Sequence, residues 1–328
     1  MARIAWLPYA DREEAEGHLG PLPDGIDVDF FTEDDCRDGE IRWPDSLAEV
    51  EFMVLPYLSG TTGLSRIAEM PRLRVVQSLL AGYEHLQPLV PEGVTLCTGA
   101  GIHDTATAEL ALALALANLR AIDVHARNGA DPSLRWRRTI GRSLADRRAT
   151  ILGYGRIGTA IERRLDGFEA ASITRVARRE RAADVATGQP YVYPFEQLPG
   201  LLAATDVLFV TCPLTEQTEH LLDARALALL PDGALVVNVA RGRVIDTDAL
   251  LTECATGRLR AALDVTEPEP LPADHPLWTT PGVTITPHVG GWSEAFQPRA
   301  DALIAAQLRR WADGEPLRNA LPTTGTAR

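Results

Sequence analysis

The sequence predicts an α/β protein with two parallel-sheet domains. Short apolar runs alternate with helical patterns along the chain, as in βα units whose helices cover both faces of a sheet. The runs form two series, one ending near residue 99 and the other starting near residue 149. With 328 residues, of which 45% are hydrophobic, the chain exceeds the size at which single cores stop growing. We therefore expect two domains.

The first series has five strand candidates, enough for one small open α/β sheet. They are RIAWLP (3–8), IDVDFF (26–31), EFMVLP (51–56), RVVQSLL (74–80) and VTLCTG (94–99).

The segment between the two series reads as one long helix and then an exposed excursion. The helix is expected from Thr105 to about Arg127, with small apolar residues on several faces. The excursion, 129–148, is rich in arginine and carries Trp136 between turn signals.

The second series has six strand candidates, as expected for a doubly wound nucleotide-binding sheet. One further helix, about 293–313, closes the chain. The candidates are the strand opening ATILGYGRIG, then 172–178, 206–212, 234–240, 260–265 and 283–288.

Composition excludes several function classes. A formal charge of −13 argues against nucleic acid or anionic lipid as the main partner. All 32 basic residues are arginine, so neither a Schiff base nor a lysine general base is available. The four cysteines form no CxxC pair, and we expect no metal site and a reducing, cytoplasmic location. The sequence has neither a secretion signal nor 18 consecutive apolar residues, so no membrane partner is expected.

A glycine motif follows the first strand of the second series and opens an amphipathic helix. Gly153 permits a tight turn, Gly155 lets the backbone approach a pyrophosphate, and Gly158 lets helix and strand pack closely. With Tyr154, Arg156 and Ile157 between them, these residues predict a dinucleotide-binding loop.

The second strand of that domain ends in arginines where an NAD-specific site usually has an acidic residue about 20 positions past the loop. The stretch 173–179 contains no acid, and four arginines lie at 175, 178, 179 and 181. Guanidinium groups bind a 2′-phosphate well, so Arg178 and Arg179 predict a preference for NADP(H), with NAD(H) also possible. The alternative is that these arginines are solvated surface charges.

Seven further stretches form a pattern along the chain, and the glycine loop among them follows a complete first domain. They are GIHDTATAEL (101–110), LGYGRIG (152–158), CPLTEQTEHLL (212–222), VVNVARGRVIDTDAL (236–250), LDVTEPEPLP (263–272), HPLW (275–278) and TPHVGG (286–291). In these stretches, in their order and in their spacing, the chain from about residue 75 onward resembles the D-2-hydroxyacid dehydrogenase family.

The resemblance implies a catalytic triad of Arg241, Glu269 and His288. Its chemistry suits reduction of a 2-keto acid, which needs a cation for the carboxylate and carbonyl, a proton donor, and a group that holds the donor. Arg241 would bind substrate, His288 would act as acid and base, and Glu269 would orient the imidazole and raise its pKa. Glu267 is the rival for the role of Glu269, since each precedes a proline, but the Leu-Pro that follows Pro270 favours Glu269.

Other family positions carry over as contacts to the cofactor or the substrate. Besides Arg241 and His288, the cofactor set comprises Pro213, Thr218, Val239, Ala240, Asp264 and Gly290. For the substrate carboxylate the resemblance points to the backbone of Ala81 and Gly82, alongside Arg241 and His288.

Departures from the family's pattern leave some roles open. Tyr83-Glu84 follows Gly82 where the family has Gly-x-Asp, and Trp292 either caps the pocket or fills core. Pro8-Tyr9 and Pro56-Tyr57, each ending a strand, are further candidates for pocket walls.

The resemblance also implies two Rossmann-like domains and a homodimer. A flavodoxin-like substrate domain (1–99 and 292–328) would hold an inserted, doubly wound NAD(P)-binding domain (100–291). The expected substrate is a small 2-keto or 2-hydroxy acid such as glyoxylate or hydroxypyruvate.

The 3-hydroxyacid dehydrogenase type depends on a catalytic lysine, and this lysine-free sequence excludes it. Formate and phosphite enzymes fit less well, because the first have Gln in place of Glu269 and the second need a lysine. The alternative from another class is a dinucleotide-sensing, corepressor-like binding protein of the same fold.

Overall fold

The computed structural model describes residues 3–36, 41–57 and 59–322, which form two compact units. The first unit contains residues up to His103 and those from Glu294 onward, and the second contains Asp104–Ser293. The sequence placed the boundaries at 99/100 and 291/292. The assignment of substrate to the first unit and cofactor to the second stays a prediction.

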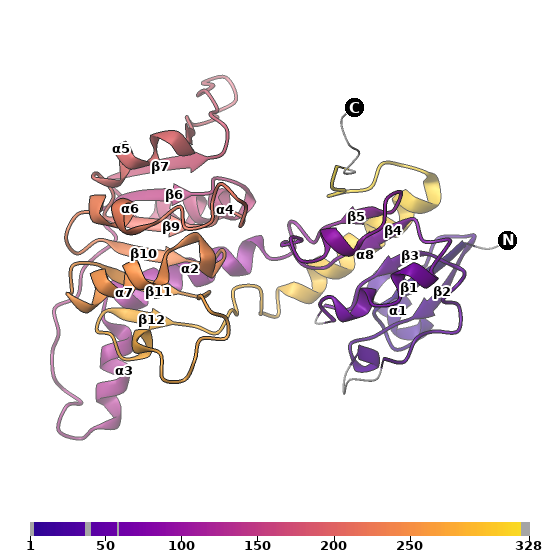
Figure 1. Cartoon of the computed structure of the whole chain (residues 1–328), viewed down its shortest axis with the longest axis horizontal. Helices are drawn as coiled ribbons and strands as arrows, with labels where there is room; N and C mark the ends of the chain where they lie inside the picture. Colours follow the sequence, from indigo (N-terminus) through magenta and orange to yellow (C-terminus); the bar gives the residue numbers. More distant parts are fainter. Residues whose placement is uncertain (1–2, 37–40, 58, 323–328) are drawn as a thin grey trace. The chain divides into compact units, whose positions relative to one another are not determined.

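The first unit is built on a five-stranded parallel sheet in the order β2-β1-β3-β4-β5 (Figure 1). This is the flavodoxin-like order, and the strands are those expected, some of them shorter. The strands are β1 (Arg3–Leu7), β2 (Ile26–Phe30), β3 (Val50–Val54), β4 (Val75–Gln77) and β5 (Thr95–Cys97).

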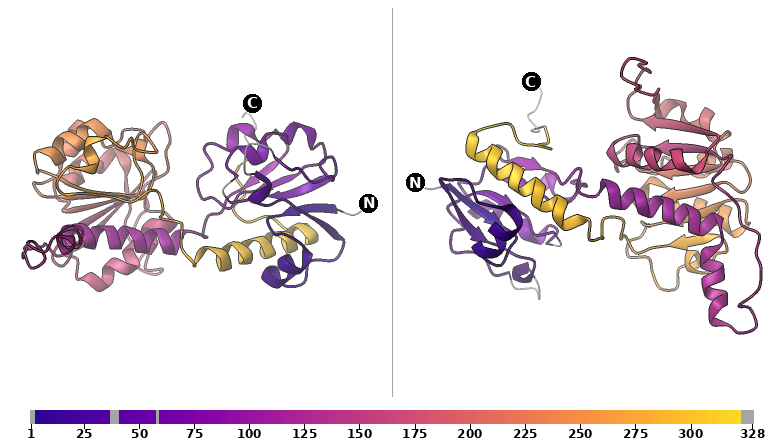
Figure 2. Two further views of the ribbon diagram at one scale, coloured as in Figure 1. Left: turned by 90° about the horizontal axis from the view of Figure 1, so that it is seen from below. Right: turned by 180° about the vertical axis from the view of Figure 1, so that it is seen from behind.

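The two faces of this sheet are covered differently. One face packs against α1 (Arg12–Leu19) and α8 (Phe296–Asp313) in a core that includes Leu7, Phe52 and Ile304. The other face is covered by short 3₁₀ turns and loops, which Figure 2 shows on the side of the sheet away from α8. The closing helix begins three residues later than expected, at Phe296 instead of 293.

The second unit has a seven-stranded parallel sheet in the order β12-β11-β10-β9-β6-β7-β8. The order reverses between β9 and β6, as in doubly wound dinucleotide-binding sheets. The strand β8 (Tyr193–Pro194) was not expected, because two residues are too few to show the apolar run that indicates a buried strand. The others are β6 (Arg148–Leu152), β7 (Ser172–Ala177), β9 (Val207–Val210), β10 (Leu235–Asn238), β11 (Arg260–Leu263) and β12 (Val283–Ile285).

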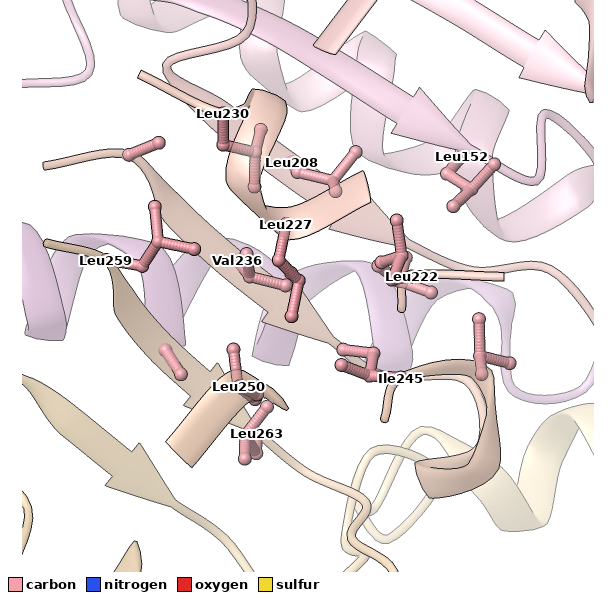
Figure 3. Packing of buried hydrophobic residues seen from close by; sticks show 14 of the residues in the cluster. Leu152, Leu208, Leu222, Leu227, Leu230, Val236, Ile245, Leu250, Leu259 and Leu263 are labelled. Carbon is pink, nitrogen blue, oxygen red and sulfur yellow. The ribbon is translucent and has the colours of Figure 1, made fainter. Parts of the chain in front are cut away.

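Successive residues of these strands enter two separate cores, one on each face of the sheet. In β6, Ile151 packs on the face of α2 and α4, whereas Leu152 packs on the face of α5, α6 and α7. Figure 3 shows the second core, where side chains from the strands meet those of α6 and α7. Burial on both faces explains why these strands read as continuous apolar runs. The helices are α2 (Asp104–Leu119), α4 (Arg156–Leu165), α5 (Leu198–Leu202), α6 (Ala224–Leu229) and α7 (Thr247–Ala255).

The single helix expected over 105–127 is wrong, because the segment forms two helices. α2 ends at Leu119, Ala121 takes a left-handed φ of 52°, and α3 (Ile122–Ala130) continues at an angle of 66°. The last carbonyls of α2 are bound from outside the helix: the N–H of Arg142 donates to Leu119 O (2.7 Å), and Arg260 donates to Asn118 O (2.9 Å). These partners replace the hydrogen bonds of a continued helix.

No single helix in the described ranges is long and apolar enough to cross a membrane. The bent pair α2 and α3 passes such a test only when the two helices are taken together, by length and composition.

Candidate active site

The glycine loop between β6 and α4 has the geometry that a dinucleotide requires. Gly153 has φ 105°, and a Cβ there would lie 2.2 Å from the backbone nitrogen of Cys212. A Cβ at Gly158 would lie 2.9 Å from Gly153 O, so helix and strand pack closely. A Cβ at Gly155 would meet nothing within 4 Å, which leaves open space beside the turn.

The N-terminus of α4 is suited to an anion. Its N-cap Gly155 offers no side-chain cap, and its first turn contains no acidic residue. The first backbone N–H groups of the helix therefore remain available to an anion, which the positive end of the helix dipole also attracts. Gly153 and Tyr154 both donate their N–H to Val176 O (2.8 and 2.9 Å), which fixes the loop to β7. These residues fit a dinucleotide pyrophosphate.

The other two loop residues are held within the second unit. Arg156 forms an ion pair with Asp104 (Nε to Oδ2, 2.7 Å), and Ile157 packs partly buried against the core shared with α2. If they contact a cofactor, Ile157 does so through its backbone, because its side chain is turned to the core.

The four arginines in and after β7 differ in their surroundings. Arg175 is half-buried and ion-paired with Glu162, so it is engaged inside the unit. Arg181 donates to Tyr154 O (2.5 Å) and lies over the Tyr154 ring, 5.4 Å from its centroid. Arg178 and Arg179 are exposed, and neither forms an ion pair with another residue that the structure describes.

The predicted cofactor residues after β9 and β10 are largely buried. The Thr218 hydroxyl donates to Pro213 O (2.6 Å) and accepts from the N–H of Thr215 (2.8 Å), so it folds the loop 213–218. Val239 and Ala240 are each 7% exposed and pack in the cores on opposite faces of the sheet. Any cofactor contact from these positions would be made by backbone or by a small part of a side chain.

Asp264, at the end of β11, holds the loop that carries His288. It is 2% exposed, and its Oδ1 accepts from Thr286 Oγ1 (2.6 Å) and from the N–H of Val289 (2.9 Å). Its Oδ2 accepts from the N–H of Gly290 (2.8 Å), and a Cβ at Gly290 would lie 2.9 Å from that oxygen. The sequence placed Asp264 and Gly290 beside the cofactor, and the structure adds this role within the loop.

His288 follows β12 and pairs with Glu269. Its Nδ1–H donates to Glu269 Oε1 at 2.5 Å, and both residues are exposed, with side-chain exposed fractions of 47% for His288 and 40% for Glu269. The backbone of His288 has φ 53°, and its N–H donates to Asp264 O (2.8 Å). A left-handed φ at a non-glycine residue is uncommon and persists where surrounding contacts hold it.

The structure separates the two candidate glutamates. Glu267 accepts from His220 Nε2 (2.9 Å) and lies 3.5 Å from Arg243 Nε. Only Glu269 therefore pairs with His288 among the described residues, whereas Glu267 has partners of its own.

Arg241 follows β10 and is electrostatically linked to this pair. Asn238 donates to Arg241 O (3.0 Å) and accepts from the N–H of Ala240 (3.0 Å), while Arg241 Nη1 donates to Ala240 O (2.7 Å). A Cβ at the next residue, Gly242, would lie 1.9 Å from Thr266 O, so the Arg241 turn directly contacts the start of the loop that carries Glu269.

The charges of the three groups shift the pKa values. The hydrogen bond to Glu269 raises the pKa of His288 above its ordinary value, although burial and the charge of Arg241 act in the opposite direction. Burial alone would raise the pKa of Glu269, but its hydrogen bond to His288 and the charges of His288 and Arg241 bring that pKa below its ordinary value. The pair is thus suited to an imidazolium held by a carboxylate.

The sequence missed the roles of Asn238 and Gly242, which position Arg241. Their only signals were a polar residue at the end of an apolar strand and a glycine directly after the arginine.

Ala81 and Gly82 belong to the first unit, in the loop after β4. No described residue accepts a hydrogen bond from either N–H, whereas Leu80 O accepts from the N–H of Gly99 (2.7 Å). Tyr83 packs partly buried against the core of this unit. Trp292 is 59% exposed, so it does not fill core.

No metal-binding group of three or more His, Cys, Asp or Glu residues occurs within 3–36, 41–57 and 59–322.

Known proteins similar to this chain point to one family. Residues 110–290 match the family described as D-isomer specific 2-hydroxyacid dehydrogenase, NAD binding domain. A protein of Homo sapiens named glyoxylate reductase/hydroxypyruvate reductase is 32% identical over 251 residues, covering 75% of this chain and 76% of that protein. A glyoxylate reductase of Pyrococcus horikoshii is 31% identical over 322 residues, covering 94% and 93%.

A solved structure is similar over nearly the whole chain. It is the D-isomer specific 2-hydroxyacid dehydrogenase of Xanthobacter autotrophicus Py2 in complex with NADPH and MES, with 29% identity, a TM-score of 0.76 and 98% of each chain covered. Together with the match over residues 110–290, these similarities identify the kind of protein. The chain belongs to the D-isomer specific 2-hydroxyacid dehydrogenase family and is an NAD(P)-dependent oxidoreductase.

Proposed function

We propose that the protein transfers a hydride between NADP(H) and a small 2-keto or 2-hydroxy acid such as glyoxylate or hydroxypyruvate, and that it also accepts NAD(H). The observation that carries this proposal is the hydrogen-bonded pair of His288 and Glu269, electrostatically linked to Arg241. The names of the human and Pyrococcus relatives support the choice of substrates.

Arg241 is the residue proposed to bind substrate. Its planar guanidinium has several donors in a fixed fork, which suits a carboxylate and the neighbouring keto oxygen. A cation beside that oxygen stabilises the negative charge that develops as C2 is reduced. The hydrogen bonds of Asn238 around the Arg241 turn fix the backbone from which this side chain extends.

His288 is the proposed acid and base. When bound, the reduced nicotinamide supplies the hydride that adds to C2 of the keto acid. His288 gives the proton from Nε2 to the C2 oxygen, so the product is the 2-hydroxy acid and the imidazole is left neutral. In the reverse direction the neutral imidazole removes that proton. Glu269 holds Nδ1–H in both states and keeps Nε2 as the reacting nitrogen.

The backbone of Ala81 and Gly82 is proposed to hold the substrate carboxylate. Two N–H groups without acceptors among the described residues suit an anion.

We expect replacement of Glu269 by Gln to move the pH profile of keto acid reduction. Reduction requires protonated His288, so kcat/KM falls as pH rises through its pKa. The amide can accept from Nδ1 but carries no charge, so the raised pKa falls and the alkaline limb moves about one unit or more toward lower pH. Glu267→Gln is the matched control, since its partners are His220 and Arg243. An unchanged profile in Glu269→Gln, or an equal shift in the control, would contradict this role.

Arg178 and Arg179 are proposed to bind the 2′-phosphate of NADP(H). They are the exposed guanidinium groups left after Arg175 pairs with Glu162 and Arg181 binds the Tyr154 carbonyl. The NADPH in the Xanthobacter structure supports this cofactor.

The preference can be measured as the ratio of kcat/KM with NADPH to that with NADH. Arg178→Ala or Arg179→Ala should lower this ratio roughly ten- to a hundredfold, because a charge-assisted hydrogen bond to phosphate is lost. Arg163→Ala, an exposed arginine on α4, is the control and should leave it unchanged. The hypothesis is abandoned if both variants keep the wild-type ratio.

The assembly and location are also proposals. We propose a homodimer, to which the excursion after α3 contributes, because Trp136 and Ile140 are 86% and 98% exposed there. Light scattering in solution distinguishes the dimer from a monomer. A cytoplasmic location stays a prediction, and the free state of all four cysteines supports it.

The test of the proposed reaction is oxidation of NADPH and NADH by a panel of 2-keto acids. Glyoxylate and hydroxypyruvate should support turnover, faster with NADPH. If the protein binds NADPH but reduces no member of the panel, the dinucleotide-sensing alternative replaces the enzyme proposal.

A further inference from the structure

The first unit contains a cavity of about 360 Å³. This volume lies within the range of small-molecule sites, roughly 300–1,000 Å³. The cavity is lined by Pro8, Tyr9, Ala10, Glu14, Thr32, Glu33, Asp34, Tyr57, Leu79, Phe296, Gln297, Ala300 and Ile304. All of these residues belong to the first unit.

The cavity lies at the carboxyl ends of the parallel strands. Tyr9 follows β1, Thr32 follows β2, Tyr57 follows β3 and Leu79 follows β4. The strand order β2-β1-β3 reverses direction between β1 and β3, and open α/β sheets bind ligands outside the carboxyl ends at such a point. The position is therefore that of a ligand site.

Leu79 connects this cavity to the loop proposed to hold the substrate carboxylate, because Ala81 and Gly82 are two and three residues further along. The connection is rigid. His103 Nε2 lies 3.0 Å from Leu79 O, and a Cβ at Gly99 would lie 2.3 Å from the same oxygen. A keto acid held by its carboxylate at this loop would thus lie beside a preformed cavity.

The cavity walls are held by packed aromatic rings and by hydrogen bonds to Asp301. Tyr57 and Phe296 pack with centroids 4.3 Å apart. Tyr9 Oη and Gln297 Nε2 both donate to Asp301 Oδ1 (2.8 Å each), which links the segment after β1 to α8. The lining is therefore fixed by contacts within the unit.

The acidic residues of the lining favour ligands without negative charge. Glu14, Glu33 and Asp34 contribute carboxylates, and none of the described lining residues is basic. A phosphate or second carboxylate on the substrate would be repelled, whereas hydroxyl groups can donate to the carboxylate oxygens.

We propose that this cavity receives the part of a 2-keto acid beyond C2, so that the enzyme favours substrates with an uncharged, hydroxylated tail over substrates with an anionic tail. The inference rests on the proposed function, because it requires a keto acid bound at Ala81 and Gly82.

Two ratios test the proposal. The first is kcat/KM for 4-hydroxy-2-oxobutanoate divided by kcat/KM for glyoxylate, which has no tail. The second is kcat/KM for 2-oxoglutarate divided by the same value for glyoxylate. Ala10 is an exposed residue of the lining, so Ala10→Trp should fill the cavity without altering the core, and should lower the ratio for 4-hydroxy-2-oxobutanoate about tenfold or more. Glu33→Arg should raise the ratio for 2-oxoglutarate about tenfold, since attraction replaces repulsion.

Matched controls lie in the same unit outside the cavity lining. Ala68→Trp and Glu92→Arg change exposed residues and should leave both ratios at wild-type values. Circular dichroism and the unfolding temperature establish that each variant is folded.

The outcomes separate the two proposals. If the wild type reduces glyoxylate but the two cavity variants keep both wild-type ratios, this inference is overturned and the proposed function stands. If the wild type reduces no 2-keto acid with either cofactor, the proposed function fails and the inference fails with it.

Discussion

Replacement of His288 by Asn should lower kcat/KM for reduction of glyoxylate by about 10² to 10⁴, which is the usual contribution of a positioned general acid. Asparagine tolerates the left-handed φ of 53° at this position and cannot deliver the proton. Binding of NADPH, measured by titration of protein fluorescence, should weaken far less than kcat/KM falls, because His288 is one of many expected cofactor contacts and the glycine loop is unchanged.

His220→Asn is the matched control. His220 also has a left-handed backbone, with φ 47°, and also pairs with a glutamate, Glu267. Only His288 is assigned to proton transfer, so the control should keep most of the wild-type activity. Equal losses in the two variants would show that a histidine–glutamate contact in this region is merely structural, and an active His288→Asn would remove it from the mechanism.

Replacement of Gly153 by Ala should destabilise the protein by about 2 kcal/mol or more and weaken the binding of NADPH. The backbone at Gly153 has φ 105°, and the new Cβ would lie 2.2 Å from the backbone nitrogen of Cys212 and 2.6 Å from its Cα. Both atoms belong to the main chain, so relief requires the backbone that follows β9, at Thr211 and Cys212, to move away from the loop. Thermal unfolding without cofactor measures the effect.

Gly155→Ala separates stability from cofactor binding. Its Cβ would meet nothing within 4 Å, so the unfolding temperature should stay near that of the wild type. The methyl group would occupy the space left for the pyrophosphate, and the Kd for NADPH should rise about tenfold or more. Wild-type affinity in this variant would place the pyrophosphate elsewhere.

The strands were predictable because of how parallel sheets are buried. Ile151 and Leu152 enter opposite cores, so both must be apolar, and a continuous apolar run results. The break in the helix over 105–127 was not predictable. It depends on Arg142 and Arg260, which donate hydrogen bonds to the last carbonyls of α2. Both arginines lie far along the chain from α2, and Arg260 is 142 residues from its acceptor.

The sequence predicted which residues form the candidate site and the order in which their motifs occur along the chain. The Leu-Pro after Pro270 favoured Glu269 over Glu267, and the structure pairs Glu269 with His288 and Glu267 with His220. The sequence could not tell which of the four arginines at 175, 178, 179 and 181 have partners, and the structure pairs Arg175 with Glu162.

The sequence by itself determined the two α/β series, the glycine loop, the order of the family's motifs and the arginines that favour NADP(H). These features depend on neighbours along the chain, where periodicity and spacing are visible. Only the tertiary structure decided the partners of Glu267, the role of Asp264 in the loop that carries His288, and the cavity at the carboxyl ends of the first sheet. Each of these depends on side chains from segments distant in sequence, whose distances are set by packing of the whole unit.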